Sequence, residues 1–169
     1  YPLLYGLIGE DIRQPIGGDF AFSADLMMYW LEQKWLPTTK LYGIDIFMSL
    51  NAILGRFKIA EVGLGAKIHK ASAPKLGPMF TQVVTTFFEK ILSRKSDWIG
   101  TPIEKPKPKP LFGLKKLDPP QELYVDLREL KNNLRNEFLS RENLLKKYLS
   151  DYLYISFKRM IETDHYDMS

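Results

Sequence analysis

The sequence predicts an α/β chain that is mostly helical, with a few short strands and a helical C-terminal extension. Residues 43–55 and 76–92 carry apolar side chains at the three- and four-residue spacing of helices. Residues 57–68 are partly β-branched and contain glycines, a pattern typical of a short strand. A Lys/Pro-rich stretch separates this part from a long amphipathic pattern. We therefore expect a mixed domain at 1–99, a linker at 100–120 and a helical extension at 121–169.

The composition indicates a globular protein and excludes several other classes. The 169 residues are 45% hydrophobic and 13% aromatic, which is enough for a sizeable core. The formal charge of +4 is spread evenly, so we expect no nucleic-acid partner. The apolar runs are too short to span a bilayer, and we expect no membrane partner. The absence of cysteine excludes disulfides and fits a reducing compartment, so we expect a cytoplasmic protein.

The first third of the chain predicts a helix end, an extended segment and a capped helix. Residues 1–8 are apolar and begin without an initiator methionine, so we expect a fragment of a longer protein. Pro15 restricts the residue before it and keeps 12–16 extended. Ser23 is a good N-cap for a helix over 24–32.

The middle of the chain predicts a helix, a strand and a second helix. The buried helix over 43–55 is stopped by a glycine and carries Asp45 in its first turn. Asp45 is either a carboxylate that stabilises the helix dipole, or a general base or substrate ligand. The strand over 57–68 is followed by a loop and then by the helix over 76–92.

The last seventy residues predict a connector and two helical pieces. The repeat Lys105–Pro110 favours polyproline II, and it is either a solvated linker or wrapping arm, or a ligand for SH3-type or anionic partners. A long amphipathic helix is expected over 121–150, continued by a second helix over 151–161. The aromatic side of the second helix must dock either on the first hundred residues or on a twin subunit, so we expect a homodimer.

Two short stretches are candidates for chemistry. Gly17, Gly18 and Asp19 form a Gly-Gly-acid step, which is either a plain turn or a loop whose backbone approaches a ligand. His69 ends the predicted strand, where it is either an ordinary strand-end residue or a metal ligand or proton carrier.

Three ordered motifs resemble the C-terminal half of retaining GT-A glycosyltransferases related to glucosyl-3-phosphoglycerate, glucosylglycerate and mannosylglycerate synthases. The resemblance covers roughly residues 1–95 and implies the C-terminal part of a GT-A nucleotide-diphospho-sugar transferase fold. Nothing beyond the linker contributes to it. The motifs are Arg13-Gln-Pro-Ile-Gly-Gly-Asp-Phe20, Tyr42-Gly-Ile-Asp-Ile46 and Gly63-Leu-Gly-Ala-Lys-Ile-His-Lys70.

The resemblance implies a role for each matching residue. Asp45 would hold the hydroxyls of the donor sugar, although some relatives carry the longer Glu there. Lys67 would lie near the phosphates, and His69 would complete a site for Mg²⁺ or Mn²⁺. The other metal ligands would come from an Asp-x-Asp motif, which together with the nucleotide-binding half would lie upstream of this chain. The loop lining the donor-sugar pocket would be formed by Gln14, Pro15, Ile16, Gly17, Gly18 and Asp19.

The expected function is transfer of a hexose from a nucleotide-sugar to a small hydroxy-acid acceptor such as glycerate or phosphoglycerate, with retention of configuration. Relatives acting on phosphorylated glycerate often carry Asn two residues after the histidine, where this chain has Ala71, which leaves the acceptor open. Because the nucleotide-binding half would be missing, the chain alone is expected to be inactive. The alternative is a non-catalytic helical interaction module, in which the Lys/Pro stretch and the 121–161 helices bind a partner.

Overall fold

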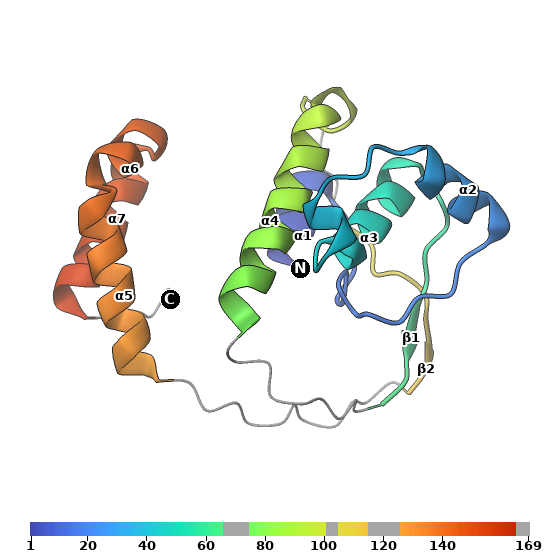
Figure 1. The fold of residues 1–169 in the computed structure, drawn as a ribbon, viewed down its shortest axis with the longest axis horizontal. Helices are drawn as coiled ribbons and strands as arrows, with labels where there is room; N and C mark the ends of the chain where they lie inside the picture. The colour runs from blue at the N-terminus through green and yellow to red at the C-terminus, as the bar shows by residue number, and fades with distance from the viewer. Residues whose placement is uncertain (66–74, 101–104, 115–125, 165–169) are drawn as a thin grey trace. The chain divides into compact units, whose positions relative to one another are not determined.

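The computed structural model describes residues 1–65, 75–100, 105–114 and 126–164. These residues form seven α-helices and a two-stranded parallel sheet (Figure 1), which confirms a mostly helical α/β chain. The chain divides into two compact units, residues 1–121 and 122–169. The first unit contains α1 (Pro2–Ile8), α2 (Ala24–Glu32), the 3₁₀ turn η1 (Thr38–Lys40), α3 (Ile44–Leu54), β1 (Glu61–Gly63), α4 (Leu76–Ser93), the 3₁₀ turn η3 (Lys95–Asp97) and β2 (Leu111–Gly113). The second contains α5 (Leu127–Ser140), α6 (Glu142–Tyr148) and α7 (Asp151–Thr163).

The four helices of the first unit confirm the sequence predictions closely. Ser23 caps α2 as expected, because its hydroxyl accepts a hydrogen bond from the backbone N–H of Leu26 at 3.3 Å. Gly9 ends α1 in the left-handed conformation, with φ of 74°, which glycine adopts without strain. Gly55 ends α3.

The core of the first unit lies where α3 meets α1 and α4. Seven of the eleven residues of α3 are buried, so this helix contacts neighbours over most of its circumference. Packing an almost entirely buried helix removes its apolar side chains from water on every side, which makes α3 the centre of the unit. The core cluster consists of Leu4, Ile12, Ile46, Leu50, Ile53, Phe87 and Ile91.

A glycine permits the close approach of α4 and η1 at the start of α3. A Cβ atom on Gly43 would lie 2.6 Å from the carbonyl oxygen of Thr38 and would also overlap the hydroxyl of Thr86. The two threonines are joined directly, since Thr86 Oγ1 donates to Thr38 Oγ1 at 2.8 Å. Gly43 therefore fixes where α3 begins relative to α4.

The predicted strand over 57–68 is much shorter in the structure. Within the described residues it forms only β1, because its one ladder partner, β2, is equally short. Phe57 instead packs its ring on Tyr29, with the ring centroids 5.4 Å apart. The register pairs Glu61 with Leu111, Val62 with Phe112 and Gly63 with Gly113.

The Lys/Pro-rich stretch over 105–113 lies along the first unit. Its strand β2 pairs with β1, and Pro108 forms a bridge with Asp11. Lys109 also forms an ion pair with Glu10. These contacts tie the stretch to the first unit, although most of its residues remain exposed. The remainder of the predicted linker is outside the described residues, apart from Gly100 and Leu114.

The second unit is a small helical assembly held by one aromatic cluster. Phe138 on α5 stacks on Tyr154 at 6.0 Å between ring centroids and meets Phe157 edge-on at 5.5 Å. Phe138 and Ile161 are its buried hydrophobic residues in the described part of the chain. Asp164 links the end of α7 to α5 through ion pairs with Lys131 and Arg135 at 3.3 and 3.2 Å.

The prediction of one helix over 121–150 was wrong, because the helix breaks at Arg141 into α5 and α6. After the break, Glu142 accepts a hydrogen bond of 2.5 Å from the hydroxyl of Tyr154 on α7 and pairs with Lys146 at 3.0 Å. Both partners hold the pKa of Glu142 below its ordinary value, and the hydrogen bond with Tyr154 has a larger effect than that with Lys146. Tertiary contacts with α7 thus replace the straight helix that local spacing favours. Two ion pairs at i, i+4 spacing flank the break, Glu137 with Arg141 at 2.6 Å and Glu142 with Lys146 at 3.0 Å.

We predict that Gly43→Ala destabilises the chain by about 1–3 kcal/mol, the usual cost of forcing extra atoms into a packed site. The reason is the 2.6 Å separation between the added Cβ and the backbone oxygen of Thr38. Urea unfolding monitored by circular dichroism measures the change.

The matched control is Gly6→Ala in α1, where an added Cβ meets nothing within 4 Å. Because alanine favours helix over glycine, this variant should be neutral or more stable by roughly 0.5–1 kcal/mol. Equal effects of the two substitutions would contradict the close approach at Gly43.

Candidate functional site

The loop that carries Gln14–Asp19 is held against α3. Ser49 is buried on α3, and its Oγ donates a 2.5 Å hydrogen bond to the backbone carbonyl of Pro15. Pro15 is itself buried, while Gln14, Gly17, Gly18 and Asp19 are exposed. Pro15 thus holds the loop against α3, and the residues that follow it, from Ile16 to Asp19, are exposed.

The glycine step of this loop lies beside Asp45. Gly18 adopts φ of +77°, a conformation that side-chain-bearing residues rarely take. A Cβ atom on Gly18 would lie 3.8 Å from Oδ2 of Asp45 in the first turn of α3. The structure therefore brings together two segments that the sequence singled out separately, and it places a carboxylate next to exposed loop backbone.

The position of Asp45 depends on contacts at both sides of the α3 N-terminus. The backbone N–H of Tyr42 donates to Oε1 of Gln82 on α4 at 3.0 Å. The N–H of Gly43 donates to the carbonyl of Thr38 at 3.0 Å. Asp45 follows directly in the half-buried first turn, so its backbone is fixed by α4 on one side and by η1 on the other.

The first motif is bonded to the start of β1, the strand that leads into the third motif. The backbone N–H of Arg13 donates to Oε1 of Glu61, the first residue of β1, at 2.5 Å. β1 ends at Gly63, and Gly65 just after it adopts φ of +90°. Lys67 and His69 themselves lie outside the described residues. The described segments alone contain no cluster of three or more His, Asp or Glu side chains suited to a metal ion.

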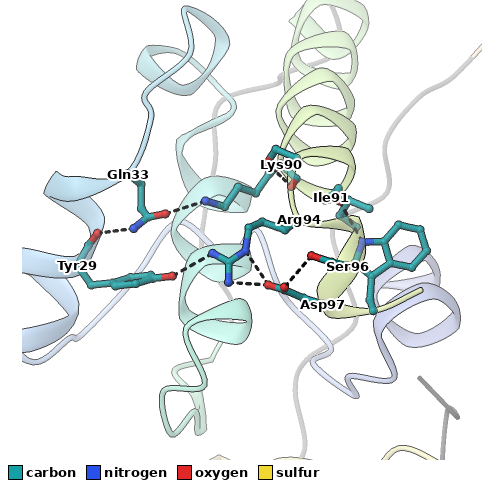
Figure 2. A network of polar contacts seen from close by, with 9 residues as sticks. Tyr29, Gln33, Lys90, Ile91, Arg94, Ser96 and Asp97 are labelled. Carbon is teal, nitrogen blue, oxygen red and sulfur yellow. Dashed lines mark hydrogen bonds and ion pairs between the residues drawn. The ribbon is translucent and has the colours of Figure 1, made fainter. Parts of the chain in front are cut away.

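Sequence reasoning missed a polar network that joins α2 to the end of α4, shown in Figure 2. Lys90 donates to Oε1 of Gln33 at 2.9 Å, and Arg94 Nη1 lies 3.5 Å from the hydroxyl of Tyr29. Arg94 also engages Asp97 through Nε at 2.6 Å and Nη2 at 2.5 Å. The i, i+4 spacing of Lys90 and Arg94 was a readable sign that they share one face of α4.

The electrostatics of this network indicate a structural role. Burial lowers the pKa of Lys90, and the neighbouring charge of Arg94 lowers it further. The hydrogen bond with Tyr29 raises the pKa of Arg94, with a smaller contribution from Asp97. Because Lys90 bonds the amide of Gln33 and Arg94 bonds the hydroxyl of Tyr29, the network joins α2 to α4, while Asp97 pairs with Arg94 just after α4.

Comparison with protein-family models, with curated proteins and with solved structures found no match to this chain. Among the helices of the described residues, none is both long and apolar enough to cross a membrane. Any statement about activity therefore depends on the residues themselves and on the resemblance of their motifs.

We predict that Ser49→Ala lowers the free energy of unfolding by about 1 kcal/mol, the typical net value of one hydrogen bond. The substitution leaves the buried carbonyl of Pro15 without the Ser49 hydroxyl. Hydrogen exchange should show faster exchange at residues 16–20, while the helix α2 that follows keeps its protection.

The matched control is Ser140→Ala, which removes a hydroxyl that bonds within its own helix end, to the carbonyl of Glu137 at 2.9 Å. This exposed change should leave exchange over residues 16–20 unaltered. Unchanged loop exchange in Ser49→Ala would contradict the anchoring role of Ser49.

Proposed function

We propose that this chain supplies the acceptor and metal-completing half of a retaining GT-A glycosyltransferase. The supporting observation is the meeting of the first two motif segments, with Gly18 beside Asp45 and Pro15 held by Ser49 on the same helix. These two segments, about thirty residues apart in the sequence, come together at the first half of α3. If Gly17–Asp19 were only a turn and Asp45 only a carboxylate that stabilises the helix dipole, neither role would require the two to lie side by side.

In this proposal the carboxylate of Asp45 accepts hydrogen bonds from hydroxyls of the hexose. The exposed backbone of Gly17 and Gly18 approaches the sugar closely, because neither residue carries a side chain. Asp19, also exposed, supplies a second carboxylate in the same loop. Carboxylates and backbone groups at a rigid helix end hold a polyhydroxyl ligand in one orientation, which lowers the entropic barrier to transfer.

The leaving group of a nucleotide-sugar is a diphosphate, so its negative charge must be neutralised as the glycosidic bond breaks. Lys67 is proposed to act near the phosphates, and His69 to provide one nitrogen ligand to Mg²⁺ or Mn²⁺. A divalent cation supplies Lewis-acid stabilisation of the diphosphate in such reactions. The donor set suits this role only in part, since one imidazole needs several oxygen ligands beside it, and these are proposed to lie outside this chain.

The acceptor is proposed to be a small hydroxy acid such as glycerate or its phosphate. Its hydroxyl would attack the anomeric carbon from the face that the diphosphate leaves, so configuration is retained and no protein nucleophile is needed. The acceptor proton would pass to the departing diphosphate oxygens. Ala71, in place of the Asn common among relatives that use phosphorylated glycerate, favours testing glycerate first.

We predict that His69→Ala abolishes metal-dependent sugar transfer, by at least about a hundredfold, because loss of a metal ligand weakens metal binding and activity strongly. The assay uses a polypeptide in which this chain is joined to its nucleotide-binding half, with Mn²⁺, nucleotide-sugar and glycerate. The chain as given, without that half, should transfer no sugar.

The control is His165→Ala, which removes the other of the two histidines and should leave turnover unchanged. Circular dichroism checks that both variants keep their helix content. Normal turnover in His69→Ala would refute the metal role of that residue.

A second candidate function is supported by the surface of the second unit. Its helices bury few hydrophobic residues, yet they leave many large apolar side chains in water. A small helical unit with such a surface is typical of a protein-interaction module. The side chains are Leu127, Leu130, Leu139, Leu144, Tyr148, Tyr152, Leu153 and Ile155.

Under this alternative, deletion of residues 121–169 should abolish association with a partner or with a second copy. Sedimentation velocity of the full and shortened chains measures the difference. A monomer whose sedimentation changes only by the lost mass would count against the interaction module and leave the glycosyltransferase proposal standing.

A further inference from the structure

The polar network between α2 and α4 contains two cations but only one carboxylate. Lys90 and Arg94 lie one turn apart on α4, and their side chains point toward Gln33 and Tyr29 (Figure 2). Asp97 forms an ion pair with Arg94. Lys90 instead donates to the neutral amide of Gln33 at 2.9 Å. Two positive charges and one negative charge leave these residues with a formal charge of +1.

The positive charge that lacks an ion pair within the described ranges is that of Lys90. Burial lowers the pKa of Lys90, and the neighbouring charge of Arg94 lowers it further, while Asp97 raises it by less. The half-buried ammonium group has thus lost part of its hydration and has received only a neutral amide in return. An anion that reached Lys90 would supply a counter-charge.

The network also offers more hydrogen-bond donors than it has acceptors. An ammonium group has three N–H bonds, and Lys90 uses one of them on Gln33. Arg94 Nη1 lies 3.5 Å from the hydroxyl of Tyr29, which is the longest contact of the network. The Tyr29 O–H itself donates to no acceptor in the described part of the chain. These donors come from two helices and face one another, so they can converge on one ligand.

The surroundings of these donors suit a charged ligand. The side chain of Arg94 is 35% exposed, and Lys90 and Tyr29 are half-buried, so solvent reaches the network from one side only in part. A charge-assisted hydrogen bond is stronger in such a partly shielded place than in bulk water. The bond between Lys90 and Gln33 already holds α4 to the end of α2, which keeps the donors in position before a ligand arrives.

We propose that Lys90, Arg94 and Tyr29 form a binding site for a phosphate group, either as the free ion or at the end of a small molecule. Oxygens of the phosphate accept hydrogen bonds from Nζ of Lys90, Nη1 of Arg94 and the hydroxyl of Tyr29. Asp97 keeps its contacts with Nε and Nη2 on the other edge of the guanidinium group. The proposal is independent of the sugar-transfer function, because none of these residues belongs to that candidate site.

Titration of the full chain with inorganic phosphate tests the site, followed by NMR of the side-chain amide of Gln33. Sodium chloride keeps the ionic strength constant, so that general screening does not change. The signal should shift with phosphate and reach saturation. Lys90→Met should weaken binding by at least about tenfold, because hydrogen bonds to charged groups contribute that much or more.

The matched control is Lys95→Met, which removes the same charge from the exposed turn η3 just after α4. This variant should bind phosphate as the unchanged chain does. Equal weakening by the two lysine variants would show that phosphate responds only to net charge, and it would overturn the proposal.

Tyr29→Phe provides a milder variant that keeps the ring packed on Phe57, with the ring centroids 5.4 Å apart. It removes one hydroxyl and should weaken phosphate binding by about three- to tenfold. Circular dichroism checks that each variant keeps its helix content. If Lys90→Met fails to fold, Tyr29→Phe decides, and unchanged affinity in this variant overturns the proposal.

Glycerol phosphate as a second ligand distinguishes the two sources of the phosphate group. Tighter binding of glycerol phosphate than of inorganic phosphate supports a site for a small phosphorylated molecule, and the reverse order supports a site for the free ion. The absence of a saturable shift with either ligand at millimolar concentration would overturn the proposal, and the network would then only join α2 to α4.

Discussion

The first unit depends on the close approach of η1, α3 and α4 at Gly43. The backbone carbonyl of Thr38 and the hydroxyl of Thr86 occupy the space that any side chain at this position would need. The hydrogen bond between the side chains of Thr86 and Thr38 also joins α4 directly to η1. From this point α3 runs through the core, holding Asp45 at its start and Ser49 one turn later. The geometry of the candidate site is thus a consequence of backbone packing.

The helices of the first unit were predictable because their signals are local. The hydroxyl of Ser23 and the apolar spacing of α3 act within one or two turns of the chain, so a reader of the sequence can find them. The break at Arg141 was not predictable in this way, because it depends on Tyr154 reaching Glu142 from another helix. The short length of β1 has a similar cause, since it is set by a partner strand about fifty residues away.

In the candidate site, too, local features could be predicted from the sequence and long-range contacts could not. The sequence identified Gly18 and Asp45 as separate candidates, but their proximity follows from the anchoring of Pro15 by Ser49, a contact across 34 residues. Ser49 itself reads as an ordinary polar residue in an apolar helix, and no local pattern marks it. Likewise, the partners of Lys90 and Arg94 lie far away in the sequence, at Gln33, which caps α2, and at Tyr29 within that helix. The sequence alone therefore identifies candidate residues by their type, but it does not identify the distant residues with which they form hydrogen bonds.

The pairing of Gly63 with Gly113 has a consequence for the alignment of the sheet. A side chain on Gly63 would strike the carbonyl of Leu114, and one on Gly113 would lie 2.6 Å from the carbonyl of Gly63. Sliding one strand by a single residue would set Val62 or Phe112 opposite a glycine and bring a Cβ into that narrow space. The two glycines therefore act as a stop that fixes the alignment of distant segments. Insertions or deletions between the strands would change the length of the connection and leave this alignment intact.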